Sequence, residues 1–357
     1  MHIVTVGRAF PPHYADQDTL IGAFRVAWAE RYHNVARIEQ LHRNVLVGGR
    51  HLALPVDAYL ALRGFTEAND AFVRVGTDVG ADAVTDALAR AGLTPRDVDA
   101  IWFTSVTGIA APSIDARLVN RLGLRPDVKR TPIFGLGCVA GAAGVARIAD
   151  YLRGNPDDIA ILLSVELCSL TLQKEDLSIP NLIASGLFGD GAACAVLVGE
   201  RRAARLAAER GAAALPRIVA TRSVFYPNTE DVMGWRIGES GFKIVLSAEV
   251  PEMVRHHLGT DVTAFLDAQG LALSDIHAWI AHPGGPKVLE AMEDVFALPP
   301  EALARTWTTL REVGNLSSAS VLLVLRETLD APPPPGAYGL MVAMGPGFCS
   351  ELVLLRW

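Results

Sequence analysis

The sequence predicts an α/β protein made of two similar halves, and three observations support this fold class. Residues 92–102 resemble residues 270–280 at an offset of 178 positions, about half of the 357-residue chain. Each segment follows an amphipathic stretch and leads into an apolar one, so helices and strands alternate as they do in layered α/β structures. Residues 189–198 and 345–354 are also alike, because each is a glycine-containing turn that leads into an apolar strand.

The expected elements can be placed in order from the N-terminus. Residues 1–7 resemble a strand and lack the charged and apolar regions of a secretion signal. Amphipathic helices are predicted at residues 73–91 and 248–269, because each stretch stops at a glycine, a frequent helix C-terminus. Apolar strands are predicted at residues 101–106, 159–165 and 277–281.

A polar connector separates the two halves. Residues 200–216 are rich in alanine, arginine and glutamate and are expected to be exposed. We therefore predict an N-terminal half at residues 1–215 and a C-terminal half at residues 216–357. Chance similarity could explain one pair of segments, but these two pairs, and the match of Gly137 to Asn315 at the offset of 178, come in the same order and favour a duplication.

Composition restricts the function. Half of the residues are hydrophobic, which allows a large core, and the net charge of -7 argues against binding nucleic acid. The longest uncharged stretch, residues 331–350, contains four consecutive prolines, so no membrane span is expected. The cysteines are far apart, which is typical of a reduced, cytoplasmic protein without a disulfide framework or a metal site. They are Cys138, Cys168, Cys194 and Cys349.

Cys138 is the candidate nucleophile. It is preceded by Gly-Leu-Gly and followed by small residues, a pattern that predicts the N-terminus of a helix. Such a position stabilises a thiolate and lowers the pKa of the thiol. The usual fate of a thiol is burial as an inert core group, and we prefer that interpretation for the other three cysteines. The glycine-rich surroundings favour a nucleophile at Cys138.

An imidazole and a carboxamide lie in similar surroundings. His282 ends a predicted strand and precedes Pro-Gly-Gly-Pro, which places it at a strand tip, where α/β sheets form sites. Asn315 starts a segment that leads into an apolar helix, so it can cap that helix and present its amide to an oxyanion. The repeat offset also relates Gly137 to Asn315. A thiol, an imidazole and a neutral donor together suit acyl transfer through a thioester.

With these segments, the chain resembles the type III polyketide synthases over nearly its whole length. This family is the chalcone synthase-like branch of the thiolase superfamily. Three motifs carry the resemblance: residues 279–286 (WIAHPGGP), residues 314–319 (GNLSSA) and residues 187–193 (LFGDGAA). The resemblance implies a thiolase fold, in which two α/β halves form five αβαβα layers, and a homodimer.

The resemblance also implies roles for the three central residues. Cys138 would take the acyl group from a starter acyl-CoA, while His282 and Asn315 would hold the malonyl-CoA carbonyl as its carboxylate leaves. The resulting enolate would attack the acyl group on Cys138 in a Claisen condensation. The CoA thioesters are substrates, and no cofactor is expected.

Further residues are similar to the family's cavity residues. Phe188 resembles a gatekeeping phenylalanine between the CoA tunnel and the cavity, and Ser317 is expected to join it in binding substrate. Residues 345–347, which are Gly345, Pro346 and Gly347, resemble the loop that supports the cavity. The family's basic CoA-binding cluster is poorly matched, and Arg43 and Arg50 are its candidates here.

Departures from the plant pattern point to the starter. In the segment that begins at Thr107, Ala111 replaces a methionine that crosses the dimer interface, and Cys168 replaces a cavity threonine. Ile244 occupies the position of a second gatekeeper, with Phe242 nearby. Such walls resemble those of bacterial alkylpyrone and alkylresorcinol synthases, which have an acyl tunnel. Because each buried CH₂ contributes about 0.8 kcal/mol, we expect a medium- or long-chain acyl starter and an alkyl α-pyrone or alkylresorcinol product.

Several alternatives remain at this point. A ketoacyl synthase III-type enzyme also uses Cys, His and Asn, but the residues around His282 and Asn315 argue against it. A pyrone-forming enzyme that joins chains bound to an acyl carrier protein stays open. An acyl-binding module without turnover is disfavoured by the intact triad. A cysteine hydrolase is disfavoured because no feature of the sequence positions a water.

Overall fold

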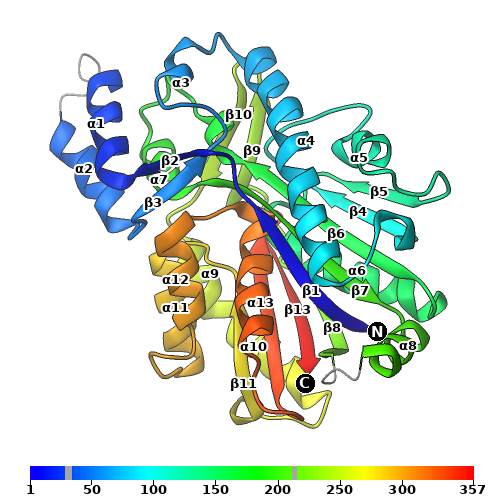
Figure 1. Ribbon diagram of the computed structural model, residues 1–357. Helices are drawn as coiled ribbons and strands as arrows, with labels where there is room; N and C mark the ends of the chain where they lie inside the picture. Colours follow the sequence, from blue (N-terminus) through cyan, green and yellow to red (C-terminus); the bar gives the residue numbers. More distant parts are fainter. Residues whose placement is uncertain (29–33, 211–214) are drawn as a thin grey trace.

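The computed structural model describes residues 1–28, 34–210 and 215–357. Within them, nine strands form one mixed sheet composed of two similar parts (Figure 1). In spatial order, the first part contains β5 (Lys129–Ile133), β4 (Ala100–Thr104), β6 (Ile159–Leu167), β7 (Asp190–Val198) and β1 (His2–Ala9). The second part contains β8 (Arg217–Phe225), β13 (Cys349–Arg356), β12 (Tyr338–Gly345) and β11 (Ile276–Ala281).

The strand pairings confirm the predicted duplication. β7 pairs antiparallel with β1 and β6, and β6 pairs parallel with β4. In the second part, β13 pairs antiparallel with β8 and β12, and β12 pairs parallel with β11. The two parts meet through β1 and β8, whose register contains the single pair His2 and Arg217. The division at residues 215 and 216 stays a prediction.

The helices lie on both sides of the two sheet parts and between them (Figure 1). In chain order they are α1 (Gln17–Trp28), α2 (Val35–Asn44), α3 (Ala58–Ala61), α4 (Phe65–Arg90), α5 (Ile114–Leu122), α6 (Ala140–Gly154), α7 (Ile179–Leu187), α8 (Glu200–Arg210), α9 (Val250–Met253), α10 (Gly259–Asp267), α11 (Pro286–Phe296), α12 (Ala304–Val313) and α13 (Ser320–Asp330). A π-helical turn at Val254–Leu258 joins α9 to α10. The predicted helices at residues 73–91 and 248–269 therefore correspond to α4 and to the α9–α10 segment.

Five layers follow from how these helices pack. One core cluster joins α4 and α5 to the outer face of the first sheet part. A second cluster surrounds α6 and α13, which are buried between the two sheet parts. A third cluster joins α10 and α11 to the outer face of the second part. This is the αβαβα arrangement of the thiolase fold, as predicted.

The two central helices approach each other closely at a glycine. A Cβ atom at Gly141 of α6 would lie 2.4 Å from the carbonyl oxygen of Ser318 and 2.5 Å from Cγ1 of Val321. Only glycine has the space for this contact. The N-terminal ends of α6 and α13 therefore meet at the centre of the molecule.

Smaller elements surround the entrance to the centre. They are the two-stranded sheet of β2 (His13–Asp16) and β3 (Gly49–Leu52), the hairpin of β9 (Met233–Gly238) and β10 (Gly241–Leu246), and helices α1, α2, α3 and α7. Figure 1 places α1, α2, β2 and β3 on one side of the molecule, away from β4 and β5.

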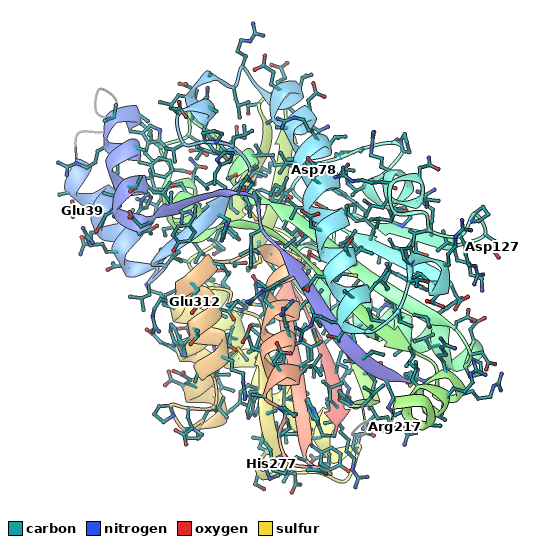
Figure 2. All side chains as sticks on the ribbon, viewed as in Figure 1. Glu39, Asp78, Asp127, Arg217, His277 and Glu312 are labelled. Atoms are coloured by element: carbon teal, nitrogen blue, oxygen red, sulfur yellow. The ribbon has the colours of Figure 1, made fainter. Side chains whose placement is uncertain are left out.

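Charged side chains lie mainly at the periphery, as the labelled Glu39, Asp78 and Asp127 illustrate (Figure 2). The predicted connector contains α8, and its residues 211–214 lie outside the described residues. None of the helices in the described ranges combines the length and the apolar run that crossing a bilayer requires.

Candidate active site

Cys138 lies in a short 3₁₀ turn, Gly137–Val139, that leads directly into α6. Gly137 has a φ of +59°, and a Cβ atom there would lie 2.6 Å from Cδ of Pro346, so the turn requires glycine. Cys138 is buried, with 9% of its surface exposed. The predicted position at the start of a central helix is therefore found.

Asn315 lies in the corresponding place of the second half, just before the 3₁₀ turn Ser317–Ala319 and α13. The turn starts two residues after Asn315, so the repeat is shifted slightly here. Ser317 has a φ of +46°, and its N–H donates to Oδ1 of Asn315 at 2.8 Å. The Cys138 thiol donates to Oγ of Ser317 at 3.6 Å. Nδ2 of Asn315 donates to the Gly284 carbonyl at 3.3 Å.

His282 follows β11, and its backbone N–H continues the strand pairing by donating to Val342 at 2.9 Å. Gly284 and Gly285 then turn the chain into α11, which starts at Pro286. His282 is 6% exposed, and neither nitrogen of its imidazole has a hydrogen-bond partner among the residues that the structure describes. A buried imidazole without partners is free to bond to a substrate or to a neighbouring group.

Cys138, His282 and Asn315 line one cavity of about 440 Å³. The structure thus brings together the three residues that the sequence analysis singled out, although they come from three separate segments. Most of the remaining wall is apolar. It includes Val106, Phe188, Met233, Trp235, Ile244, Leu246, Met344, Pro346 and Phe348, together with Ser317.

Burial controls the charge states of the site. The pKa of the Cys138 thiol is raised to about 12, chiefly by burial and to a smaller extent by the nearby Glu166 carboxylate, while the Ser317 hydroxyl opposes this shift. The expectation that the helix N-terminus lowers this pKa is wrong, because desolvation of a fully enclosed thiol outweighs it. Burial also lowers the pKa of His282 to about 3. At rest and neutral pH, the thiol and the imidazole are both uncharged.

A buried carboxylate that the sequence analysis missed holds the asparagine motif in place. Oε1 of Glu166, on β6, accepts from Oγ of Ser318, and Oε2 accepts from Oγ1 of Thr107 at 3.0 Å and from the Val106 N–H at 3.1 Å. Burial raises the pKa of Glu166. A lone glutamate inside an apolar strand was the available signal, since such a charge is rarely buried without partners.

The predicted supporting loop packs directly on the cysteine turn. A Cβ atom at Gly345 would lie 2.8 Å from the Val139 nitrogen, and Gly347 has a φ of +136° with Phe225 close to it. Pro346, between them, lines the catalytic cavity. Glycine is therefore required on both sides of this proline.

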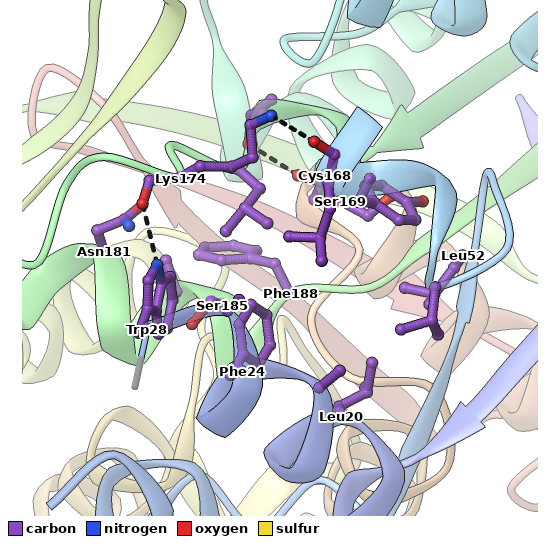
Figure 3. A pocket seen from close by; sticks show the side chains of 18 of the residues that line it. Leu20, Phe24, Trp28, Leu52, Cys168, Ser169, Lys174, Asn181, Ser185 and Phe188 are labelled. Atoms are coloured by element: carbon purple, nitrogen blue, oxygen red, sulfur yellow. Dashed lines mark hydrogen bonds between the residues drawn. The ribbon is translucent and has the colours of Figure 1, made fainter. Parts of the chain in front are cut away.

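A second, larger cavity of about 1060 Å³ adjoins the first. Cys168, Phe188, Trp235 and Ile244 line both cavities and form the wall between them. Figure 3 shows Phe188 between the α1 side chains and Cys168. The apolar residues of α1 and β3 that line this cavity include Leu20, Ala23, Phe24, Ala27, Trp28 and Leu52.

For four predicted binding residues, the structure shows contacts that differ from the expected contact with substrate or CoA. Thr107 is engaged by Glu166 and lines neither cavity, and Ala111 is exposed on the surface after β4. Arg43 is exposed and pairs with Asp18 and Glu39. Arg50 lines the second cavity but is 2% exposed, and its guanidinium donates to two carbonyls of α7. Their roles toward substrate or CoA stay predictions.

Trp235 and Lys287 are among the cavity residues that the sequence analysis did not identify. Trp235 forms part of the wall between the cavities, and Lys287, the second residue of α11, is exposed and lines the catalytic cavity. Lys287 follows the histidine motif directly, which could have indicated it. Among the described residues, no group of three His, Cys, Asp or Glu side chains is placed to bind a metal.

Two family models together match most of the chain. The N-terminal domain of chalcone and stilbene synthases matches residues 1–201, and the C-terminal domain of the same enzymes matches residues 217–357. The chain therefore belongs to the chalcone and stilbene synthase family. It is a type III polyketide synthase, an acyltransferase that uses CoA thioester substrates, among them malonyl-CoA, and no further cofactor.

Bacterial enzymes are among the proteins similar to this chain. The chain is 51% identical to 1,3,6,8-tetrahydroxynaphthalene synthase of Streptomyces peucetius subsp. caesius, over 99% of this chain and 93% of that protein. It is 36% identical to a putative chalcone synthase of Bacillus subtilis, over 99% and 98% of the two chains. The crystal structure of 1,3,6,8-tetrahydroxynaphthalene synthase from Streptomyces coelicolor A3(2) superimposes with a TM-score of 0.91 at 30% identity, covering 100% and 99% of the two chains.

Proposed function

We propose that the protein assembles a polyketide chain on Cys138 by repeated decarboxylative condensation of malonyl-CoA and releases a cyclised, hydroxylated aromatic product. The observation that carries this proposal is the cavity that a thiol, a carboxamide and an imidazole line together, the imidazole having no hydrogen-bond partner among the described residues. Each of the three supplies one requirement of the reaction: a nucleophile, a proton acceptor and a donor for an oxyanion.

Loading of the thiol comes first. As a thioester enters, the proton of the Cys138 thiol passes to His282, whose two nitrogens have no hydrogen-bond partner within the described part of the chain. The sulfur attacks the thioester carbonyl and CoA leaves as a thiol, taking up that proton. Because both groups are neutral at rest, the charged pair forms only when substrate is present.

Extension follows in the same cavity. The carbonyl of malonyl-CoA accepts hydrogen bonds from Nδ2 of Asn315 and from the ring N–H of neutral His282. The bond from the α-carbon to the carboxylate breaks, CO₂ leaves, and the electron pair forms an enolate that attacks the acyl group on Cys138. The C–S bond to Cys138 then breaks and the thiolate leaves, so the extended chain is a CoA thioester that acylates Cys138 again before the next extension. In an apolar cavity these donors stabilise the developing negative charge more than they would in water.

For the starter, we propose malonyl-CoA itself, with a tetrahydroxynaphthalene-type product. The relative that is 51% identical over 99% of this chain is a 1,3,6,8-tetrahydroxynaphthalene synthase. A naphthalene that carries hydroxyls in this pattern is what a chain assembled wholly from two-carbon units gives on folding, so no other starter is needed.

A second candidate is supported by the adjoining cavity. Its volume of about 1060 Å³ and its apolar lining suit a medium- or long-chain acyl starter, whose products would be alkyl α-pyrones or alkylresorcinols. The wall at Phe188, Trp235 and Ile244 would have to open for such a chain to pass from Cys138. The two candidates therefore differ in whether this wall stays closed.

One experiment separates the candidates. Purified protein is mixed with labelled malonyl-CoA, alone or with acyl-CoA starters of increasing length, and products are identified by mass spectrometry. Cys138→Ala is the control without the nucleophile. A product from malonyl-CoA alone supports the first candidate, whereas products that appear only with long acyl-CoA starters support the second. A Cys138→Ala protein that still forms product would refute the proposed reaction. Absence of product with every CoA ester would point to donors bound to an acyl carrier protein.

The proposed assembly is a homodimer in the cytoplasm. Ile109 is 45% exposed and lies after β4, two residues before Ala111, and Phe134 is 50% exposed and directly follows the edge strand β5. A second copy of the chain would cover these apolar side chains. Sedimentation velocity of the wild type and of Phe134→Glu tests this: a dimer that becomes a monomer in the variant supports the interface, and a wild-type monomer refutes it.

For CoA, we propose Lys287 as a contact at the cavity mouth. It is exposed at the N-terminus of α11, where the helix dipole also favours an anion. A Lys287→Met variant should raise KM for malonyl-CoA and leave kcat nearly unchanged, as expected for a residue that binds substrate and transition state alike.

A further inference from the structure

The C-terminus of α7 is held by an unusual set of partners. A helix leaves its last carbonyls without intrahelical donors, and buried carbonyls need donors from elsewhere. The Ala184 carbonyl is bonded within the chain by the Phe188 N–H at 3.0 Å. The next three carbonyls, those of Ser185, Gly186 and Leu187, are bonded by groups from distant segments.

Arg50 supplies two of these four bonds. Its Nη2 donates to the Ser185 carbonyl at 2.5 Å, and its Nη1 donates to the Gly186 carbonyl. Nε2 of Gln17 also donates to Gly186, at 3.1 Å. Arg50 is 2% exposed, and the buried Asp190 balances its charge. A guanidinium can bond two adjacent carbonyls at once because its donors form a rigid fork, which a lysine ammonium lacks.

The last carbonyl connects α7 to the asparagine motif. The Leu187 carbonyl accepts from the Asn315 N–H at 3.0 Å, and the Asn315 carbonyl accepts from the Gly189 N–H at 3.0 Å. These two bonds form an isolated parallel bridge between Phe188 and Asn315. The backbone of Asn315 therefore takes its position from the residues on either side of Phe188, and these follow directly from the helix end that Arg50 holds.

We propose that Arg50 is a positioning residue: by holding the end of α7, it sets the place of the Asn315 amide against the malonyl thioester. The inference rests on the role proposed above for Asn315. Arg50 does not touch the reacting atoms. Its effect passes along the chain from Gly186 to Leu187 and then through the two backbone hydrogen bonds to Asn315. Loss of Arg50 therefore displaces the Asn315 amide without removing it. It thus has a role other than the CoA contact that the sequence suggested.

The test separates decarboxylation from thiol reactivity. In a Cys138→Ala background condensation cannot follow, so breakdown of malonyl-CoA to CO₂ and acetyl-CoA, with a solvent proton added at the α-carbon, reports the Asn315 step alone. With Cys138 present, alkylation by iodoacetamide reports the thiol. Arg50→Lys keeps the charge and removes the fork, and Gln17→Leu removes one of the two donors to Gly186. Arg201→Lys is the matched control, because Arg201 forms an ion pair with Asp157 on the surface.

We expect Arg50→Lys to lower kcat for decarboxylation by roughly 10- to 100-fold, since a displacement of about 1 Å has effects of that size. KM for malonyl-CoA and the alkylation rate of Cys138 should change less than about twofold, and Gln17→Leu should have a smaller effect of the same kind. In an Asn315→Ala background, Arg50→Lys should cause no further loss, because the two act on one step.

Three results would overturn the inference. Equal losses in decarboxylation and alkylation would mean that Arg50 only stabilises the fold, and unchanged decarboxylation in a folded Arg50→Lys protein would mean that the connection does not operate. Additive losses in the Asn315→Ala background would place the effect elsewhere. Gln17→Leu provides the same comparison if Arg50→Lys does not fold. Absence of decarboxylation in the Cys138→Ala parent would instead refute the proposed function.

Discussion

Replacing Gly141 by alanine tests whether the close contact of the two central helices sets the active-site geometry. A Cβ atom at this position would lie 2.4 Å from the carbonyl oxygen of Ser318 and 2.5 Å from Cγ1 of Val321. Ordinary contacts begin at 3.4 Å, so the two helices must separate by about 1 Å, because a backbone oxygen cannot rotate away. Cys138 precedes one helix and Ser317 precedes the other, so their separation must change.

The energies can be compared directly. Alanine is favoured over glycine within a helix by about 1 kcal/mol, whereas overpacking a core costs about 1 to 3 kcal/mol. We therefore expect the free energy of unfolding to fall by about 1 kcal/mol, within a range of about 0 to 2 kcal/mol. The activity should fall more steeply, by roughly 100-fold, since misplacing catalytic groups by about 1 Å has an effect of that order.

Gly154→Ala is the matched control, because Gly154 ends the same helix and a Cβ atom there would meet no atom within 4 Å. Both variants would be measured by urea unfolding and by product formation from labelled malonyl-CoA. Gly154→Ala should match the wild type or be slightly more stable. If Gly141→Ala retains the stability and activity of the Gly154→Ala protein, the contact is not tight in solution and the reasoning fails.

Three other predictions follow from the site. Burial lowers the pKa of His282 to about 3 and that of His42 to about 4. As the pH falls, the unfolded chain therefore protonates these histidines at a higher pH than the folded protein does. The free energy of unfolding should then fall by roughly 1.4 kcal/mol per pH unit for each histidine from about pH 6 to about pH 4. Unfolding curves of His282→Gln should lose one such contribution, and an unchanged slope would contradict it. Trp235→Ala should join the two cavities and lengthen the longest acyl-CoA starter accepted, as seen by mass spectrometry; an unchanged starter range would argue against the wall. Ser317→Gly should relieve a positive φ and raise the free energy of unfolding in urea by up to about 1 kcal/mol. The same variant should slow alkylation of Cys138, because the Ser317 hydroxyl lowers the pKa of that thiol. Faster alkylation would show that this hydroxyl does not stabilise the thiolate.

Much of the fold was predictable because the two halves of the chain have similar sequence patterns. The repeated segments at residues 92–102 and 270–280 lead into β4 and β11, which occupy the same place in the two sheet parts. Glycine-bounded patterns likewise located Cys138, His282 and Asn315, since each lies where an element ends or starts. These are local features, and a local pattern can be recognised from one sequence alone.

What was missed depends on contacts between distant segments. The fork of Arg50 meets carbonyls of α7 more than a hundred positions away, and Trp235 becomes part of a wall only when the β9–β10 hairpin folds over the cavity. The pKa of Cys138 was predicted in the wrong direction because a helix N-terminus is visible in sequence, whereas complete enclosure is not. Glu166 was missed for the same reason.

The single register pair between β1 and β8 has a consequence for how activity arises during folding. Each sheet part can complete its own strand pairing without the other, but the thiol belongs to one part and the imidazole and amide belong to the other. The chemistry therefore exists only after α6 and α13 have docked between them. During refolding, secondary structure should return before turnover does, and the interval between the two would measure how long the halves take to find each other.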